Sequence, residues 1–272
     1  MNMSLSIPDA LFAAFTAVMA LALHMPAHAA ELDAHEIMEK NFFVTKTKTL
    51  KSDATMLLVN DKDQTRERKT TTVSKLQKNG VDSSLLVRFS TPADIKGTGF
   101  LQIEHSEGDD DQWIYLPALK KSRRLVANNK KDSFVGSDFS YGDISLPKVD
   151  AYVHSLLRSE NLSGQDCYVI ESVPKDDTVK HDSGYSKKII WVRKDNFLEA
   201  KVEYYDLSGR LLKTQTTGNH KMVEPDTQRW VALRREMINH QTAHKTILTF
   251  DAVESGLSLA DDLFTTRYLE RE

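Results

Sequence analysis

The chain has 272 residues, of which 40% are hydrophobic and 28% are charged, and this composition excludes disordered and collagen-like proteins. Its formal net charge of −3 provides no global field for DNA or acidic membranes, so nucleic acid is not an expected partner. The single cysteine, Cys167, excludes an internal disulfide, and the core must therefore be stable without one.

The N-terminus indicates export. Residues 10–23 form an apolar run that is too short to span a bilayer comfortably, and Ala27 and Ala29 supply the small-residue pattern of a cleavage site. We interpret residues 1–29 as a secretory signal peptide. The segment before the apolar run contains Asp9 and lacks the Lys or Arg that a signal peptide normally carries there. Cleavage removes one acid and leaves 36 basic against 38 acidic residues, a net charge of −2. We expect a mature protein in the periplasm.

The first predicted element of the mature chain is an amphipathic helix. Ile37, Met38 and Phe42 recur at helical spacing, and Asp33 is a suitable N-cap. From residue 50 onward, segments rich in Val, Ile, Thr, Tyr and Phe alternate with turn clusters such as KNG and LSGQ. This texture predicts a meander of roughly ten or more antiparallel strands.

Hydrophobic and polar residues alternate along several of these segments, for example in residues 84–89 and 199–205, so one face of the sheet is apolar and the other wet. A sheet of this size must curl, and its apolar face needs a cover. The N-terminal helix, residues 123–144 and the C-terminal tail are available for this purpose. No linker or repeat divides residues 30–272, which predicts a single domain.

A basic run precedes an aromatic one in the middle of the chain. Lys120, Lys121, Arg123 and Arg124 are expected on a hairpin tip and its return strand. Two interpretations remain open for these four cations. They are either a solvated edge that prevents aggregation or a contact patch for phosphate headgroups or an acidic partner.

The aromatic run that follows is too polar for a central strand and too aromatic for an ordinary loop. Phe134, Phe139 and Tyr141 need an apolar surface, whereas Gly136 and Gly142 permit sharp turns. A lid that folds across the mouth of the curved sheet satisfies both requirements.

Several catalytic motifs fail on inspection. His240 and His244 have the spacing of a zinc helix, but glutamine replaces the glutamate base, and the flanking residues favour a strand that would separate the two rings. Cys167 lies in an apolar segment typical of a buried structural thiol. We therefore predict no enzyme activity, no metal and no cofactor. A hydrolase that depends on Ser137 or Asp138 is the least favoured alternative.

Three stretches resemble the LolA-like family of outer-membrane lipoprotein-sorting proteins: FSTPADIKGTGFL (89–101), WIYLPALKKSRRLVANNKKDSFVGSDFSYGDI (113–144) and LFTTRYLER (263–271). The resemblance implies a mainly β fold with a few helices, in which an unclosed antiparallel β-barrel curls around an apolar cavity. It also implies a periplasmic carrier that shuttles the acyl chains of a lipid or lipoprotein between the inner and outer membranes. The chain is longer than the LolA carriers and lacks the lipobox cysteine of the LolB receptor.

The partners follow from the same resemblance. They are a lipid or an acylated protein as cargo, an inner-membrane transporter of RND or ABC type, and a membrane surface in transient contact. The branch with the GSDFSYGD-type motif is linked to RND-type exporters. We expect a monomer, and the alternative function is a non-transporting scaffold subunit of an envelope transport complex.

Large apolar and aromatic side chains are the candidates for the cavity and its lid. They are Phe42, Phe89, Phe100, Ile103, Trp113, Tyr115, Phe134, Phe139, Tyr141, Trp191 and Tyr204. Arg88 is the candidate for the arginine that locks the lid in the LolA carriers.

Overall fold

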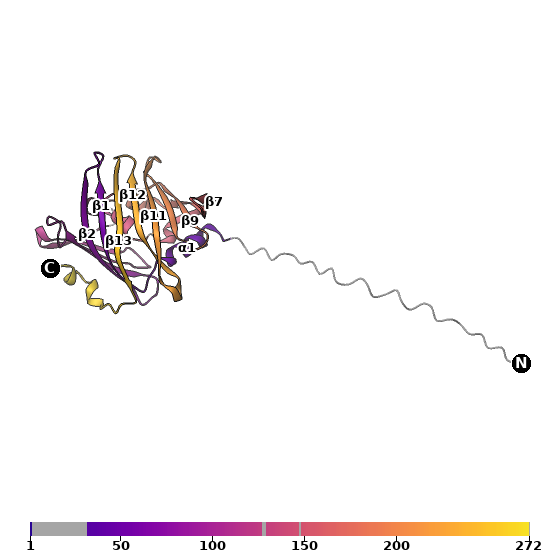
Figure 1. Cartoon of the computed structure of the whole chain (residues 1–272), viewed down its shortest axis with the longest axis horizontal. Coiled ribbons are helices and arrows are strands. Elements are labelled where there is room, and N and C mark those ends of the chain that lie inside the picture. Colours follow the sequence, from indigo (N-terminus) through magenta and orange to yellow (C-terminus); the bar gives the residue numbers. More distant parts are fainter. Residues whose placement is uncertain (2–31, 127–128, 147, 272) are drawn as a thin grey trace. The chain divides into compact units, whose positions relative to one another are not determined.

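A sheet of 13 antiparallel strands forms the body of the protein (Figure 1). The computed structural model describes Met1 and residues 32–126, 129–146 and 148–271. Apart from Met1, the predicted signal peptide lies outside the described residues. The strands are β1 (Thr49–Val59), β2 (Thr65–Leu76), β3 (Ser83–Thr91), β4 (Gly99–Ile103), β5 (Asp111–Leu116), β6 (Lys121–Leu125), β7 (Tyr152–Leu162), β8 (Gln165–Pro174), β9 (Lys187–Arg193), β10 (Glu199–Tyr205), β11 (Leu211–Glu224), β12 (Arg229–Asn239) and β13 (His244–Ser255).

The strand order joins the two halves of the chain at one seam. The sheet runs β6-β5-β4-β3-β2-β1-β13-β12-β11-β10-β9-β8-β7, so the first strand pairs with the last, and β6 and β7 form the two edges. No pairing among the described residues joins β6 to β7. The predicted mainly β, unclosed antiparallel sheet is therefore confirmed.

Short turns explain why neighbouring strands are antiparallel, since a tight turn returns the chain beside itself. The predicted turn clusters lie between strands. Gly164 has a φ of 88° and Gly209 a φ of 79°, a backbone conformation that glycine adopts without steric cost.

The N-terminal helix α1 (Ala34–Val44) begins where its cap predicts. Asp33 accepts a hydrogen bond from the Glu36 backbone at 2.8 Å, and the Glu36 carboxylate accepts one from the Asp33 backbone at 2.9 Å. Ile37 and Met38 are buried on one side of the helix, which packs on the inner side of the sheet. Asn41 donates a 2.9 Å hydrogen bond to the Phe197 carbonyl and so ties α1 to the β9–β10 turn.

The connection between β6 and β7 crosses the inner side of the sheet, because its two ends belong to opposite edges. We call residues 129–146, the described part of its centre, the lid. The lid contains the short helices η3 (Phe134–Gly136) and α2 (Tyr141–Ile144), and η4 (Val149–Ala151) follows it. The predicted use of the aromatic run is observed: the three lid aromatics are buried against inner strand residues.

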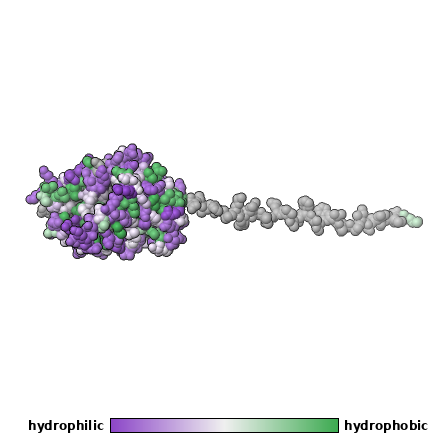
Figure 2. Space-filling model, turned by 90° about the horizontal axis from the view of Figure 1, so that it is seen from above, coloured by the Kyte–Doolittle hydropathy of each residue, from purple (hydrophilic) through white to green (hydrophobic). Residues whose placement is uncertain are grey.

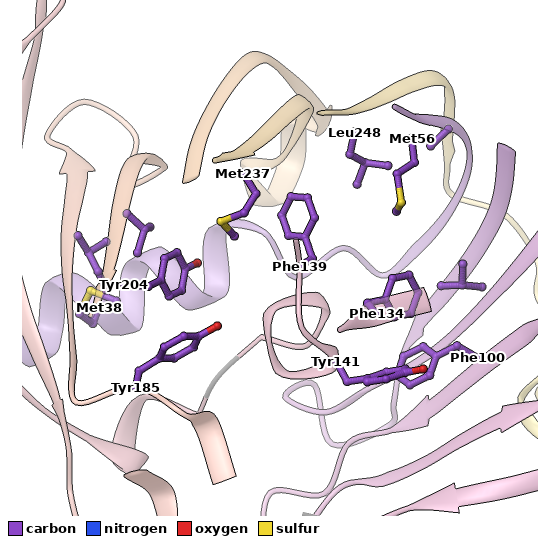
Figure 3. Close-up of a cluster of buried hydrophobic side chains, with 14 of the residues drawn as sticks. Met38, Met56, Phe100, Phe134, Phe139, Tyr141, Tyr185, Tyr204, Met237 and Leu248 are labelled. Atoms are coloured by element: carbon purple, nitrogen blue, oxygen red, sulfur yellow. The ribbon is translucent and has the colours of Figure 1, made fainter. Parts of the chain in front are cut away.

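The lid aromatics form one cluster with the sheet (Figure 3). The Phe134 ring lies 5.5 Å from that of Phe100, 5.4 Å from that of Tyr141 and 5.8 Å from that of Phe89. Phe139 points away from this group toward Met237. Aromatic burial therefore holds the lid against both halves of the sheet.

The C-terminal tail covers the outer side of the sheet, not the inner side. It contains η6 (Asp261–Phe264) and α4 (Thr266–Leu269), and it buries Phe264 and Leu269 against Leu86 and Leu101. A β-carbon on Gly99 would lie 2.6 Å from Leu269 Cδ1, so glycine permits this close contact. The tail provides a second apolar layer over β3–β5.

The remaining helical turns are η1 (Pro117–Leu119), α3 (Asp177–Ser183) and η5 (Pro225–Thr227). Among the described residues, no helix has the length and hydrophobicity needed to span a membrane. Figure 2 shows hydrophobic residues in small patches among hydrophilic ones on the face in view. The edge strand β7 exposes Val153 and Leu157, which are 58% and 47% exposed.

Candidate functional site

A pocket of about 290 Å³ lies between α1, the lid and the inner faces of β1–β3 and β10–β13. Its volume is close to the lower end of the range for small-molecule sites, roughly 300–1,000 Å³. The apolar lining residues are Leu50, Ala54, Met56, Leu85, Val87, Phe134, Ile144, Leu146, Leu198, Trp230, Val231, Ala232, Leu248 and Phe250. The polar lining residues are Asn41, Thr45, Ser52, Thr70, Thr72, Ser74, Glu199, Gln215, Thr217, His220 and Arg235.

One wall of this large pocket carries hydroxyl groups. Thr70, Thr72 and Ser74 occupy successive inward positions of β2, and Ser52 on β1 is the cross-strand partner of Thr72. Ser52 is 2% exposed, and its Oγ has no hydrogen-bond partner among the described residues. A buried hydroxyl without a partner costs about 1–3 kcal/mol, so this wall suits an occupant that offers hydrogen bonds.

A small pocket of about 70 Å³ adjoins the large one. The two pockets share Asn41, Leu146, Glu199, Gln215 and Arg235, which mark their junction. The other polar lining residues of the small pocket are Asp143, Ser145, Lys148, Tyr152, His154, Ser172, Lys188 and Tyr204. The site therefore consists of two chambers in contact, and the smaller one is lined by more charged side chains.

A β-bulge directs Glu199 into this junction. Glu199 pairs with Val192 and Lys201 with Trp191, so Ala200 is the extra residue. Regular alternation with Lys201 would place Glu199 on the outer face of β10, and the bulge places it inside instead. Burial raises the pKa of the Glu199 carboxyl, an effect that Arg235 only partly opposes.

Arg235 lies at the same junction, on the inner face of β12. Its Nη2 donates a 2.9 Å hydrogen bond to Gln215 Oε1 and a 3.4 Å hydrogen bond to the Asp143 carbonyl. Its guanidinium lies 5.2 Å from the centre of the Phe139 ring. Gln215 in turn donates a 3.4 Å hydrogen bond to Glu199, so it lies between the two charged groups.

A buried ion pair joins the lid to β11, in the half of the sheet formed by β7–β13. Lys213 Nζ on β11 lies 2.6 Å from Asp143 Oδ2, and both side chains are almost fully buried. Tyr185 donates its hydroxyl to the same carboxylate at 3.0 Å. Burial opposes ionisation of Asp143, but Lys213, Lys188 and hydrogen bonds outweigh it and lower the pKa of this carboxyl.

Further hydrogen bonds hold the lid to both halves. Thr246 on β13 donates to Asp138 Oδ2 at 2.7 Å, and Ser145 donates to Gln102 on β4 at 2.8 Å. Arg68 on β2 donates to the Val135 carbonyl. The candidate Arg88 lies on the outer face, where it donates to the Tyr268 carbonyl in the tail. Arg68 and Arg235 therefore contact the lid, whereas Arg88 contacts the tail.

Seven of the predicted cavity and lid residues lie on the inner side. Phe134 lines the large pocket, Phe42 and Tyr204 line the small one, and the others pack in the core around them. The residues in the core are Phe89, Phe100, Phe139 and Tyr141.

Four predicted cavity residues lie on the outer side. Ile103, Trp113 and Tyr115 pack under the C-terminal tail, and Trp191 packs with Cys167 in a separate cluster. Alternation explains this placement, because residues an odd number of positions apart on a strand lie on opposite faces. Phe100 and Ile103 are three apart on β4, so only one of them can point inward.

The four predicted contact cations lie on the β5–β6 hairpin, outside both pockets. Lys120, Lys121, Arg123 and Arg124 are all exposed, and Lys120 is at the turn with a φ of 50°. Arg124 forms an ion pair with Asp111. Three cations of the hairpin therefore remain free of ion pairs with described residues.

The structure also locates the residues of the rejected catalytic motifs. His240 follows the end of β12 and His244 begins β13, and no group of residues suited to a metal ion occurs in the described part of the chain. Cys167 is a buried free cysteine whose thiol pKa is raised by burial.

Sequence reasoning missed Glu199, Arg235, Lys188 and the hydroxyl wall of β2. Each of these residues points inward at a strand position where the alternation pattern predicted an apolar side chain. The KTTTVS segment carried one usable signal, since its alternation places Val73 on one face and three hydroxyl residues on the other. The inward direction of Glu199 had no such signal, because a bulge is not visible in the residue pattern.

The sequence and the fold both match known proteins. A family described only as an uncharacterized protein matches residues 81–271, and no curated protein matches the chain. A solved domain from Vibrio parahaemolyticus, described as an outer membrane lipoprotein-sorting protein, is 34% identical, with a TM-score of 0.80 over 88% of this chain and 98% of that one.

Two other solved structures share the fold. A DUF1329 family protein from Desulfovibrio piger is 30% identical, with a TM-score of 0.80 over 87% of this chain and 97% of that one. A LolA superfamily protein from Nitrosomonas europaea is 23% identical, with a TM-score of 0.68 over 88% of this chain and 100% of that one. The similarity spans nearly the full length of each relative.

Proposed function

The chain belongs to the LolA superfamily, among the outer membrane lipoprotein-sorting protein domains, and on this premise we propose that it is a non-catalytic periplasmic carrier of acyl chains. The observation that carries the proposal is the large pocket, with its mostly apolar lining beneath a lid that contacts both halves of the sheet. The cargo is a lipid or an acylated protein, shuttled between the inner and outer membranes by a monomer with one domain over residues 30–272.

The energetics of hydrocarbon transfer favour a carrier of this kind. An acyl chain in water costs roughly 0.8 kcal/mol for each exposed CH₂, so a sixteen-carbon chain costs on the order of 12 kcal/mol to move without cover. A lidded pocket between two halves of one sheet reduces this cost by replacing water with apolar side chains.

The inner-membrane partner in this proposal is an exporter of RND type, with an ABC-type transporter as the other possibility. The GSDFSYGD segment, residues 136–143, supports an interaction of this kind because it lies in the lid, the element that must move for cargo to enter. Its Asp138 and Asp143 form the contacts that hold the lid to β11 and β13. A partner that competes for these contacts would open the pocket.

A second candidate function is a non-transporting scaffold subunit of an envelope complex. The observation in its favour is the exposed basic hairpin, whose Lys120, Lys121 and Arg123 have no ion-pair partner among the described residues. Such a surface suits an acidic partner or the phosphate groups of a membrane.

Occupation of the pocket by a protein side chain tests the carrier proposal. Ala232 on β12 lines the large pocket, so Ala232→Phe places a ring where an acyl chain would lie. We expect the affinity for a fluorescent fatty acid to fall about tenfold or more, which corresponds to about 1.4 kcal/mol of binding free energy. Ala252→Phe, at an exposed position of β13, is the matched control and should bind as the wild type does.

The wild type supplies the second readout. Protein purified gently should contain lipid that mass spectrometry identifies, and Ala232→Phe should contain less. Delipidated wild-type protein that never takes up the fatty acid would contradict the carrier proposal.

A further inference from the structure

Two cations and a carboxyl group lie around the small pocket, and none of them forms an ion pair with a described residue. They are Arg235, Lys188 and Glu199, and no opposite charge of the described chain lies within 4.0 Å of any of them. All three line the small pocket. Charges removed from water in this way are stabilised when an occupant supplies the missing partner.

Lys188 is the most enclosed of the three. Its side chain extends inward from β9, and the residue is 7% exposed. Nζ lies 5.2 Å from the ring centre of Tyr152, 5.3 Å from that of Tyr185 and 5.2 Å from that of Tyr204. Aromatic faces attract a cation but provide no counter-charge, so the ammonium group retains donors for an anionic ligand.

Arg235 also retains donors. A guanidinium group has five N–H donors, and the contacts of Arg235 with Gln215 and the Asp143 carbonyl involve only Nη2. Both acceptors are formally neutral. A planar guanidinium with free donors matches the geometry of a carboxylate or a phosphate.

The charge balance of the small pocket is positive. Asp143 and Lys213 neutralise each other at 2.6 Å, and Lys148 lies 3.6 Å from Asp110. The two remaining cations, Arg235 and Lys188, therefore outnumber the one remaining carboxyl, Glu199. Burial raises the pKa of that carboxyl, which favours its neutral form and increases the positive balance.

We propose that the two pockets bind a long-chain fatty acid as a free acid, with its carboxylate at Arg235 and Lys188 in the small pocket and its hydrocarbon chain in the large one. The inference rests on the proposed function and specifies its cargo. A chamber of about 70 Å³ admits a small anionic group, and the adjoining apolar chamber of about 290 Å³ continues from it. Glu199 and Gln215 between the chambers supply further hydrogen-bonding groups to the headgroup.

The test compares two ligands with the same hydrocarbon chain: hexadecanoic acid, at a pH where its headgroup is ionised, and methyl hexadecanoate, whose headgroup is neutral and carries one additional methyl group. Trp230 lines the large pocket, whereas the other two tryptophans, Trp113 and Trp191, lie on the outer face, so tryptophan fluorescence of the delipidated protein reports binding. We expect the acid to bind about tenfold more tightly than the ester or better, since hydrogen bonds to charged groups are the stronger ones.

Substitutions assign the preference to the two cations. Arg235→Gln and, separately, Lys188→Gln should each reduce the ratio of acid to ester affinity toward one. Arg234→Gln is the matched control, because the neighbouring Arg234 pairs with Glu236 away from the pockets and its loss should leave the ratio unchanged.

The results that would contradict this inference differ from those that would contradict the carrier proposal. Equal affinity of the wild type for acid and ester overturns the headgroup assignment and leaves the carrier standing. A preference for the acid that survives both pocket substitutions also overturns the assignment. Absence of binding for both ligands overturns the carrier proposal together with the inference.

Discussion

Glu199 shows how a single backbone irregularity determines the chemistry of the cavity. The bulge at Ala200 moves this carboxyl from the wet face of β10 to the inner face, beside Gln215. A buried carboxyl reduces stability, since the folded protein must desolvate it or keep it protonated. Such a group is typical of a functional site, where stability is reduced in favour of binding.

The effect of Glu199 on stability should depend on pH. Burial raises the pKa of this carboxyl above its unfolded value of about 4.3, so the folded state binds more protons between the two pKa values. The contribution of Glu199 to the stability of the wild type is therefore most favourable below about pH 4.3 and becomes less favourable as the pH rises through the folded pKa.

The substitution Glu199→Gln removes this loss of stability at high pH. We expect urea denaturation of the ligand-free protein to give a variant more stable than the wild type at pH 7, by on the order of 1 kcal/mol, and no more stable at pH 4. Glu203→Gln, on the outer face of the same strand beside Lys201, is the control and should not gain stability at pH 7. The same gain for Glu199→Gln at both pH values would contradict the assignment.

The lid lines both pockets and contacts both halves of the sheet. Its aromatic side chains pack on the sheet, and its polar contacts reach β2 and β4 on one half and β11 and β13 on the other. The Lys213–Asp143 pair is the most buried of these contacts. A buried ion pair contributes little when compared with apolar residues, but loss of one partner leaves an uncompensated charge.

Lys213→Met should therefore weaken the lid strongly. We expect a loss of about 3–5 kcal/mol of unfolding free energy, because Asp143 remains buried without its cation. Amide hydrogen exchange of residues 133–144 should accelerate as well, since the lid loses its ion pair with β11. Arg158→Met breaks the exposed pair with Glu160 and should change the unfolding free energy little, because solvent screens exposed pairs. A Lys213→Met variant as stable as Arg158→Met would show that the pair does not hold the lid.

At the scale of the whole molecule, the unclosed sheet leaves two edges with different surfaces. β7 exposes apolar side chains, whereas β6 and its hairpin expose the basic ones. An exposed strand edge promotes aggregation unless charge protects it, so the cations of β6 serve either as edge protection or as a docking surface.

Charge reversal of the hairpin separates docking from cargo binding. Lys121→Glu with Arg123→Glu should abolish co-purification with an inner-membrane transporter and leave fatty acid affinity unchanged, because both cations lie outside the pockets. Lys62→Glu with Lys221→Glu alters exposed cations elsewhere and should leave co-purification intact. A reversed hairpin that aggregates while co-purification persists would instead assign the cations to edge protection.

The sequence was sufficient for those features that depend on neighbouring residues. Asp33 and Glu36 specify the start of α1 through a capping box, and the glycine turns specify where strands reverse. The aromatic and glycine content of residues 133–144 was sufficient to predict a lid. These features could be predicted because each depends on contacts within a few residues of the chain.

Only the tertiary structure decided which face of each strand lines the cavity. Trp113, Tyr115 and Trp191 lie outside, while Glu199 lies inside, because strand phase depends on bulges and on the layer that packs against each face. The C-terminal tail could not be assigned to the outer face from its composition, since either face would bury its apolar residues. By itself the sequence determined the class of fold and the presence of a lid. Long-range packing determined the small charged pocket, because its charges come from separate strands that only the folded sheet brings together.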